Sequence, residues 1–178
     1  MSHPLQFIFS GLPGVGKSTL AIQLSKHFGA TYLRVDAIEQ GLKDECGLTI
    51  YAQGYFIAYR LAADNLKHGL SVVSDSCNSV MESRKAWQQV AMDSQAKFIN
   101  IEVLCSDQNE HQQRVESRQP AVDGLRLPTW QEVQNREYQP WPEQVISIDT
   151  ARQTPEQSFE ALLAMLTDNK LYLTNFYN

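Results

Sequence analysis

The residues best suited to chemistry form one short run near the amino terminus, in which glycines precede a lysine and two hydroxyl side chains. The run has the spacing Gly-x-x-x-x-Gly-Lys-Ser and lies between an apolar segment and a helical one, the context of a phosphate-binding P-loop (Walker A motif). Its glycines let successive backbone N–H groups converge on phosphate oxygens. The motif predicts a nucleotide site made of Gly11, Leu12, Pro13, Gly14, Val15, Gly16, Lys17, Ser18 and Thr19.

The lysine and the serine of this run have separate expected roles. Lys17 can reach the β- and γ-phosphates of a nucleotide, and the Ser18 hydroxyl can bind Mg²⁺. The expected ligands are therefore ATP and Mg²⁺, and Lys17 is a predicted catalytic residue.

Two aspartates are predicted at strand ends, where an open parallel sheet binds its ligands. Asp36 ends the second expected strand and can take the proton of an attacking hydroxyl; the alternative is a helix N-cap. Asp75 ends the third and can hold Mg²⁺ or contact the acceptor; the alternative is a turn or cap residue.

Two arginines are predicted to act on the nucleotide phosphates. Arg114 and Arg118 lie four residues apart, on one face of an expected helix, and arginine stabilises charge on a transferring phosphoryl group. The alternative is a solvated helix face on which Glu110 pairs with Arg114.

The elements that must position these residues alternate between strands and helices, which indicates crossover connections and a mostly parallel sheet. Apolar runs and periodicity predict strands at 5–9, 31–35, 70–74, 98–105 and 145–148. They predict helices at 17–27, 49–67, 82–94, 107–118, about 130–138 and 155–166. The proline-containing stretch 119–142 is predicted to be a lid or loop with that one short helix.

Together these motifs resemble the P-loop kinases grouped with polynucleotide kinase, AAA-type ATP-binding proteins of the nucleoside triphosphate hydrolase superfamily. The resemblance implies an α/β P-loop NTPase fold, with a five-stranded, mostly parallel sheet flanked by helices. It also implies transfer of the γ-phosphoryl group of ATP to a hydroxyl, Asp36 as general base, and a mobile arginine-bearing lid, here about 107–142. Matching positions, and one aromatic helix, add acceptor-site candidates: Asp36, Asp75, Asn78, Arg84 and Tyr55. The alternatives are a solvated helix arginine for Arg84 and core packing for Tyr55.

One position departs from the pattern of that family and bears on the acceptor. Its polynucleotide-type members carry a phosphate-binding arginine three residues after the base, and this position is Glu39 here. A carboxylate repels phosphate, so a neutral or cationic small molecule is favoured over nucleic acid as the acceptor. A polynucleotide 5′-hydroxyl kinase and a regulatory nucleotide-binding ATPase without acceptor chemistry remain the alternatives.

Composition agrees with this interpretation. The 178 residues suit one domain, here a single P-loop kinase domain over 1–178, and the net charge of −5 disfavours nucleic acid as a partner. Three widely spaced cysteines predict neither disulfides nor zinc and fit a cytoplasmic protein. No membrane or targeting segment is expected. The aromatic tail 171–177 is expected to pack on the body or to form a dimer contact, so the protein is predicted to be a monomer or a homodimer.

Overall fold

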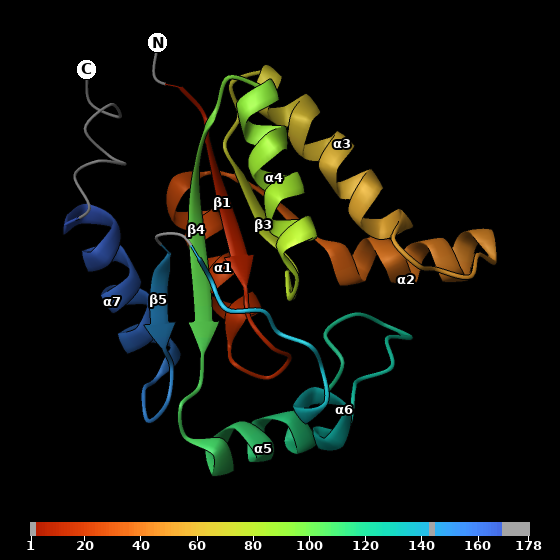
Figure 1. The fold of residues 1–178 in the computed structure, drawn as a ribbon, viewed down its shortest axis with the longest axis vertical. Coiled ribbons are helices and arrows are strands. Elements are labelled where there is room, and N and C mark those ends of the chain that lie inside the picture. Colours follow the sequence, from red (N-terminus) through yellow and green to blue (C-terminus); the bar gives the residue numbers. More distant parts are fainter. Residues whose placement is uncertain (1–2, 143–144, 169–178) are drawn as a thin grey trace.

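The computed structural model describes residues 3–142 and 145–168, which contain a five-stranded parallel sheet. The strands are β1 (Leu5–Ser10), β2 (Thr31–Arg34), β3 (Val72–Asp75), β4 (Lys97–Leu104) and β5 (Ile146–Asp149). Their order across the sheet is β2-β3-β1-β4-β5, with every pairing parallel (Figure 1). All six residues of the central strand β1 are buried, as expected for a strand covered on both faces.

Helices cover both faces of the sheet. They are α1 (Lys17–Phe28), α2 (Val35–Cys46), α3 (Gln53–Lys67), α4 (Met81–Asp93), α5 (Gln108–Ser117), α6 (Trp130–Gln134) and α7 (Pro155–Asp168). On one face α1 and α7 pack through Leu24 and Leu162, and on the other α3 and α4 pack through Ala62 and Trp87. One hydrophobic core thus packs on each face of the sheet and stabilises the strands whose ends form the site.

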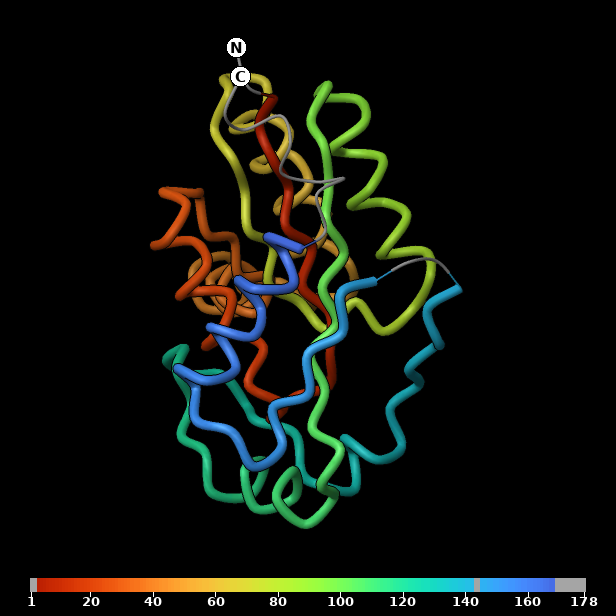
Figure 2. Tube along the Cα trace, turned by 90° about the vertical axis from the view of Figure 1, so that its left-hand side faces the viewer, coloured from red at the N-terminus to blue at the C-terminus, as the bar shows by residue number. Residues whose placement is uncertain are grey.

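The segment 107–142 lies beyond the carboxyl ends of β1 and β4 (Figures 1 and 2). It begins with α5, whose N-cap Asp107 accepts hydrogen bonds from two first-turn amides, and it includes α6, which starts with a Thr129/Glu132 capping box. The segment therefore faces the edge of the sheet where the P-loop and the strand-end aspartates were predicted to meet.

The predicted strands and six helices are present, with shifted boundaries and one additional helix. The helix predicted over 49–67 begins at Gln53, whose side chain accepts hydrogen bonds from the amides of Tyr51 and Ala52, and α6 ends at Gln134 rather than near 138. The additional helix, α2, was not predicted; it buries Val35 and Gln40 and ends at Gly47 in the left-handed conformation. The aromatic tail 171–177 lies outside the described residues.

Among the described residues, no helix combines the length and the apolar character needed to cross a membrane.

Candidate functional site

The P-loop has the conformation that its glycines predict. It joins β1 to α1, and a Cβ on Gly11 would overlap the carbonyl oxygen of Val103 on β4. Gly14 has a φ of +89°, and a Cβ there would lie 2.5 Å from a methyl group of Val115 on α5. Only glycine fits both the backbone and the packing. The first-turn amides of α1 therefore lie at the end of β1, where they can bind an anion.

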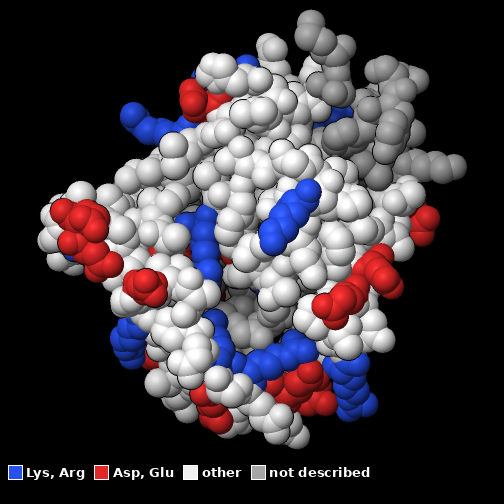
Figure 3. Space-filling model, turned by 180° about the vertical axis from the view of Figure 1, so that it is seen from behind, with Lys and Arg blue, Asp and Glu red and all other residues white. Residues whose placement is uncertain are grey.

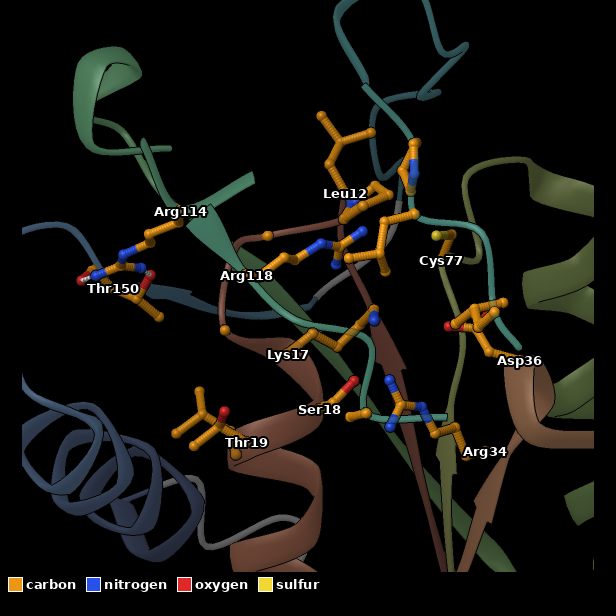
Figure 4. Close-up of a pocket in the computed structure, with 18 of the residues that line it drawn as sticks. Leu12, Lys17, Ser18, Thr19, Arg34, Asp36, Cys77, Arg114, Arg118 and Thr150 are labelled. Carbon is orange, nitrogen blue, oxygen red and sulfur yellow. Dashed lines mark hydrogen bonds between the residues drawn. The ribbon is translucent and has the colours of Figure 1, made fainter. Parts of the chain in front are cut away.

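A cavity of about 670 Å³ opens above this loop (Figure 4). Its walls include the P-loop, the start of α2 and much of the segment 107–142. In the space-filling view, blue side chains crowd round the central hollow, whereas most of the red ones lie further out (Figure 3). Six lining residues are cationic and two are acidic: Lys17, Arg34, Arg114, Arg118, Arg126 and Arg136, against Asp36 and Glu39.

Lys17 and Asp75 form a buried ion pair at the base of the site. The Lys17 Nζ donates to Asp75 Oδ1 at 3.0 Å, and the Tyr32 hydroxyl donates to Asp75 Oδ2 at 2.6 Å. Burial alone would raise the pKa of Asp75, but the Lys17 ammonium and hydrogen bonds from Ser18 and Tyr32 hold it below its usual range. Burial would lower the pKa of Lys17, and chiefly Asp75 holds it above its usual value. Both groups are therefore charged at neutral pH.

The neighbourhood of Ser18 and Asp75 fits Mg²⁺. The Ser18 hydroxyl lies within hydrogen-bond reach of the Asp75 carboxylate, so two hard oxygen donors meet beside the P-loop. Mg²⁺ prefers such oxygen donors and takes its other ligands from water and phosphate. No described group of three His, Cys, Asp or Glu side chains could hold a metal without such help. The predicted pair can therefore act with a nucleotide but forms no metal site of its own.

Asp36 lines the same cavity, but it does not end a strand as predicted. The strand β2 stops at Arg34, and Asp36 lies in the first turn of α2. No side chain caps this helix, so the cap alternative does not apply to Asp36. In Figure 4 the Asp36 carboxylate lies across the cavity from the P-loop, beyond Lys17 and Ser18. This position suits a group that acts on a molecule placed next to the nucleotide phosphates.

Arg114 and Arg118 both line the cavity, but they do not share a helix face. Because α5 ends at Ser117 and Arg118 is extended, just before Pro120, the helical spacing is lost. The Arg114 guanidinium is held by Glu110 at 2.6 Å and by the hydroxyl and carbonyl oxygens of Thr150. In Figure 4 Arg114 and Thr150 lie at the end of the site opposite Asp36, whereas Arg118 lies centrally, near Lys17.

Four predicted acceptor-site residues lie outside the cavity lining: Asp75, which pairs with Lys17, and Asn78, Arg84 and Tyr55. Arg84 is fully buried and donates to the carbonyl oxygens of Asn78, Gln139 and Pro140, so it is a structural residue rather than a phosphate ligand. Asn78, also fully buried, donates to the carbonyl of Phe9.

Tyr55 is half-buried, with its ring centre 6.0 Å from that of Tyr59, and burial raises its pKa to about 12. It packs against the core beneath α3 and is not among the residues that line the cavity. Its contact with an acceptor stays a prediction.

Sequence reasoning missed two cationic residues that line the cavity and one histidine outside the lining that contacts the P-loop. Arg34 and Arg136 reach the cavity from the end of β2 and from just after α6, although no motif marks either. His111 Nε2 lies 2.9 Å from the carbonyl oxygen of Pro13, to which a protonated Nε2 donates, and so couples α5 to the P-loop. Among these, only His111 carried a sequence signal, as a polar residue one turn before Arg114.

The sequence matches the AAA domain family over residues 7–137, so the chain belongs to this family. No curated protein matches the sequence. The match spans the P-loop, Asp36, Asp75 and the arginines of segment 107–142.

Solved structures share the fold at low sequence identity. A Chloroflexus aurantiacus protein classed as a kinase superposes with a TM-score of 0.72 at 22% identity, covering 96% of this chain and 98% of its own. A Sinorhizobium meliloti gluconokinase gives 0.65 at 18%, covering 98% and 99%. The Mycobacterium tuberculosis APS kinase, in complex with AMPPNP and APS, gives 0.66 at 16%, covering 94% and 99%. The chain therefore has a kinase-like P-loop fold.

Proposed function

We propose that this member of the AAA domain family is an ATP-dependent phosphotransferase that moves the γ-phosphoryl group of ATP to a hydroxyl of a small molecule. One observation carries the proposal: the Asp36 carboxylate lines the same cavity as Lys17 and Ser18 of the P-loop. A binding module that only senses nucleotide has no need of a carboxylate at that place. A phosphotransferase needs one there to orient and deprotonate the acceptor.

Transfer would join the acceptor oxygen to the γ-phosphorus and release ADP. The acceptor oxygen forms a bond to the γ-phosphorus while its proton passes to an Asp36 carboxylate oxygen. The bond between the γ-phosphorus and the oxygen bridging to the β-phosphate breaks, and ADP leaves. Asp36 then returns the proton to solvent, so one ATP and one alcohol give ADP, a phosphate ester and a proton.

The cationic side chains would stabilise the charge that moves in this step. Lys17 and the first-turn amides of α1 would bind the β- and γ-phosphates, and Arg118 would contact the transferring group, because it lies centrally beside Lys17. Arg114, already held by Glu110 and Thr150, would contact the nucleotide at the other end. When bound by Ser18, Asp75 and the phosphates, Mg²⁺ would neutralise part of the phosphate charge.

The segment 107–142 would act as the lid of this site. It supplies Arg114 and Arg118, and it rests on the P-loop through His111 and through Val115 at Gly14. Closing over ATP would exclude water and limit hydrolysis. These contacts support the proposal, because they keep Arg114 and Arg118 at the wall of the cavity.

The test measures ADP release with Mg²⁺ and a panel of hydroxyl acceptors that includes sugars, sugar acids, nucleosides and a short oligonucleotide with a 5′-hydroxyl. We expect slow hydrolysis alone and faster turnover with at least one acceptor. Equal slow rates with every acceptor would favour the regulatory ATPase, and stimulation by the oligonucleotide alone would favour the polynucleotide kinase.

Two variants make this test specific. Asp36→Asn should bind ATP nearly as tightly as the wild type while transfer falls by about 10²-fold or more, the usual scale for a general base. Glu45→Gln is the matched control, because Glu45 is an exposed carboxylate further along α2 that does not line the cavity. Loss of ATP binding in Asp36→Asn, or equal transfer in both variants, would refute the role of Asp36.

A further inference from the structure

Three arginines meet on the Asp36 side of the cavity although they come from distant segments. Arg34 ends β2, Arg118 follows α5 and Arg136 follows α6. Arg136 Nη1 donates to Cys77 Sγ at 3.4 Å, which places its guanidinium at that wall. Arg34 projects toward the space between Ser18 and Asp36 (Figure 4). The chain thus gathers three positive charges around the point where an acceptor would stand.

These charges have no ion-pair partner among the described residues. Arg126, by contrast, pairs with Glu132 at 2.8 Å, and Arg114 with Glu110 at 2.6 Å. The buried Nε atoms of Arg34 and Arg118 also have no hydrogen-bond partner within the described part of the chain. Both arginines line the cavity, and a buried donor without a partner costs free energy, so the site lacks anions to match its cations.

The three arginines also repel one another. Burial lowers the pKa of Arg118 most, and the charges of Arg34 and Arg136 lower it further, while Asp36 opposes them. Such a cluster costs free energy in the empty site and regains it when an anion binds, since guanidinium groups form paired hydrogen bonds with carboxylate or phosphate.

The nucleotide does not account for the whole cluster. The P-loop amides, Lys17 and Mg²⁺ would already neutralise most of the triphosphate. Arg118, which lies in the same central part of the site as Lys17, would contact the γ-phosphate of the nucleotide (Figure 4). Arg34 and Arg136 remain, next to Asp36 and Cys77, where the second substrate would bind.

Glu39 does not cancel this charge. It lies one turn beyond Asp36 against Gly54 of α3, where a Cβ would overlap its side chain. Burial and the neighbouring Asp36 raise the pKa of Glu39, so it carries its negative charge less readily than an exposed glutamate. Glu39 therefore repels phosphate less than an exposed glutamate would, and the three arginines line the same cavity.

We propose that the phosphoryl acceptor is itself an anion, a hydroxyl compound whose carboxylate or phosphate group binds Arg34 and Arg136 while its hydroxyl faces Asp36. This proposal rests on the phosphotransferase function and replaces the neutral or cationic acceptor expected from the sequence. A carboxylate and a phosphate group can both supply the negative charge and the paired oxygen atoms that a guanidinium binds.

The experiment measures anion binding beside an occupied nucleotide site. The protein is first saturated with AMPPNP and Mg²⁺, so that the γ-phosphate position is filled. Calorimetry measures this binding. It is then titrated with inorganic phosphate, with glycolate as a small hydroxycarboxylate, and with ethylene glycol as the neutral counterpart. We expect phosphate, glycolate or both to bind and ethylene glycol not to bind. The anion that binds more tightly shows whether the acceptor carries a phosphate or a carboxylate group.

The variants Arg34→Gln and Arg136→Gln should each weaken anion binding by at least about tenfold, the scale of one charge-assisted contact, and leave AMPPNP affinity within about twofold. Arg60→Gln is the control, because Arg60 is exposed on α3 and does not line the cavity. Unchanged thermal melting will show that each variant is folded.

The outcomes separate the two proposals. Failure of AMPPNP to bind would refute the phosphotransferase function at its first step. Three results would overturn the anionic acceptor alone, provided that AMPPNP binds normally. They are no binding of either anion, equal binding of ethylene glycol, and anion binding that is unchanged in both arginine variants.

Discussion

Replacing Arg84 by methionine should destabilise the protein, because the Arg84 side chain holds two segments of the chain together. From its position after the third strand it was expected to contact substrate, but its guanidinium is fully enclosed. Its nitrogen atoms donate to the carbonyls of Asn78 at 2.8 Å, Gln139 at 2.7 Å and Pro140 at 3.3 Å, and the group lies 4.2 Å from the Trp141 ring centre. Arg84 thus joins the end of segment 107–142 to the loop after β3 by hydrogen bonds.

The size of its contribution follows from these contacts. Arg84→Met keeps most of the apolar volume and removes three donors, leaving carbonyl groups that each cost about 1–3 kcal/mol when buried and unpaired. Losing the stacking on Trp141 adds about 1–2 kcal/mol, and no longer burying a charge offsets part of the total. We expect the free energy of unfolding to fall by about 3–5 kcal/mol.

Urea unfolding followed by tryptophan fluorescence measures this change, and calorimetry measures ATP affinity under conditions where the variant is folded. The control is Lys85→Met, which removes a positive charge from the next, exposed position of α4 and should change stability by less than about 0.5 kcal/mol. If Arg84→Met unfolds like the wild type but binds ATP much more weakly, Arg84 is a phosphate contact and the structural reasoning is refuted.

Three further predictions concern the P-loop. Lys17→Ala should lower transfer by about 10²-fold or more in an ADP-release assay, and retained activity would contradict the P-loop assignment. Asp75→Asn should lower the free energy of unfolding in urea by about 3–5 kcal/mol near neutral pH, because it leaves Lys17 buried without its partner. Since the native pKa of Asp75 lies below 3.8, this loss should stay constant down to about pH 4 and shrink in more acid solution; a constant loss at pH 2 would contradict the pairing. Gly14→Ala should destabilise more than Gly29→Ala, because both have a positive φ but only the first meets Val115; equal losses would exclude the packing contribution.

The fold was predictable because its signals are local. The central strand β1 is an apolar run, and the P-loop sequence marks the junction of β1 and α1. The alternation of strands and helices indicates parallel pairing, although it does not predict the order of the strands. The missed helix α2 shows the limit: Gly41 and a polar surface weaken its pattern, and its stability depends on packing Val35 and Ile38 against α3.

The positions of side chains in the site were most predictable where a motif fixes the backbone. Lys17 and Ser18 lie where the P-loop must place them. The direction of the Arg84 and Arg118 side chains depends instead on where a neighbouring segment ends. Arg84 turns inward because the 138–141 stretch supplies carbonyls and aromatic rings, and no spacing in the sequence shows that the two regions meet.

The net charge of a chain is a poor guide to the charge of its ligand. The chain has 15 lysines and arginines against 20 aspartates and glutamates, which argues against anionic partners. Yet six of those cations line one cavity with only two carboxylates. An anion in the site interacts with charges within a few ångströms, whereas charges on the far surface are screened over about 8–10 Å. The local excess therefore decides the binding, and Arg34 and Arg136 bear on the acceptor more strongly than the net charge of −5.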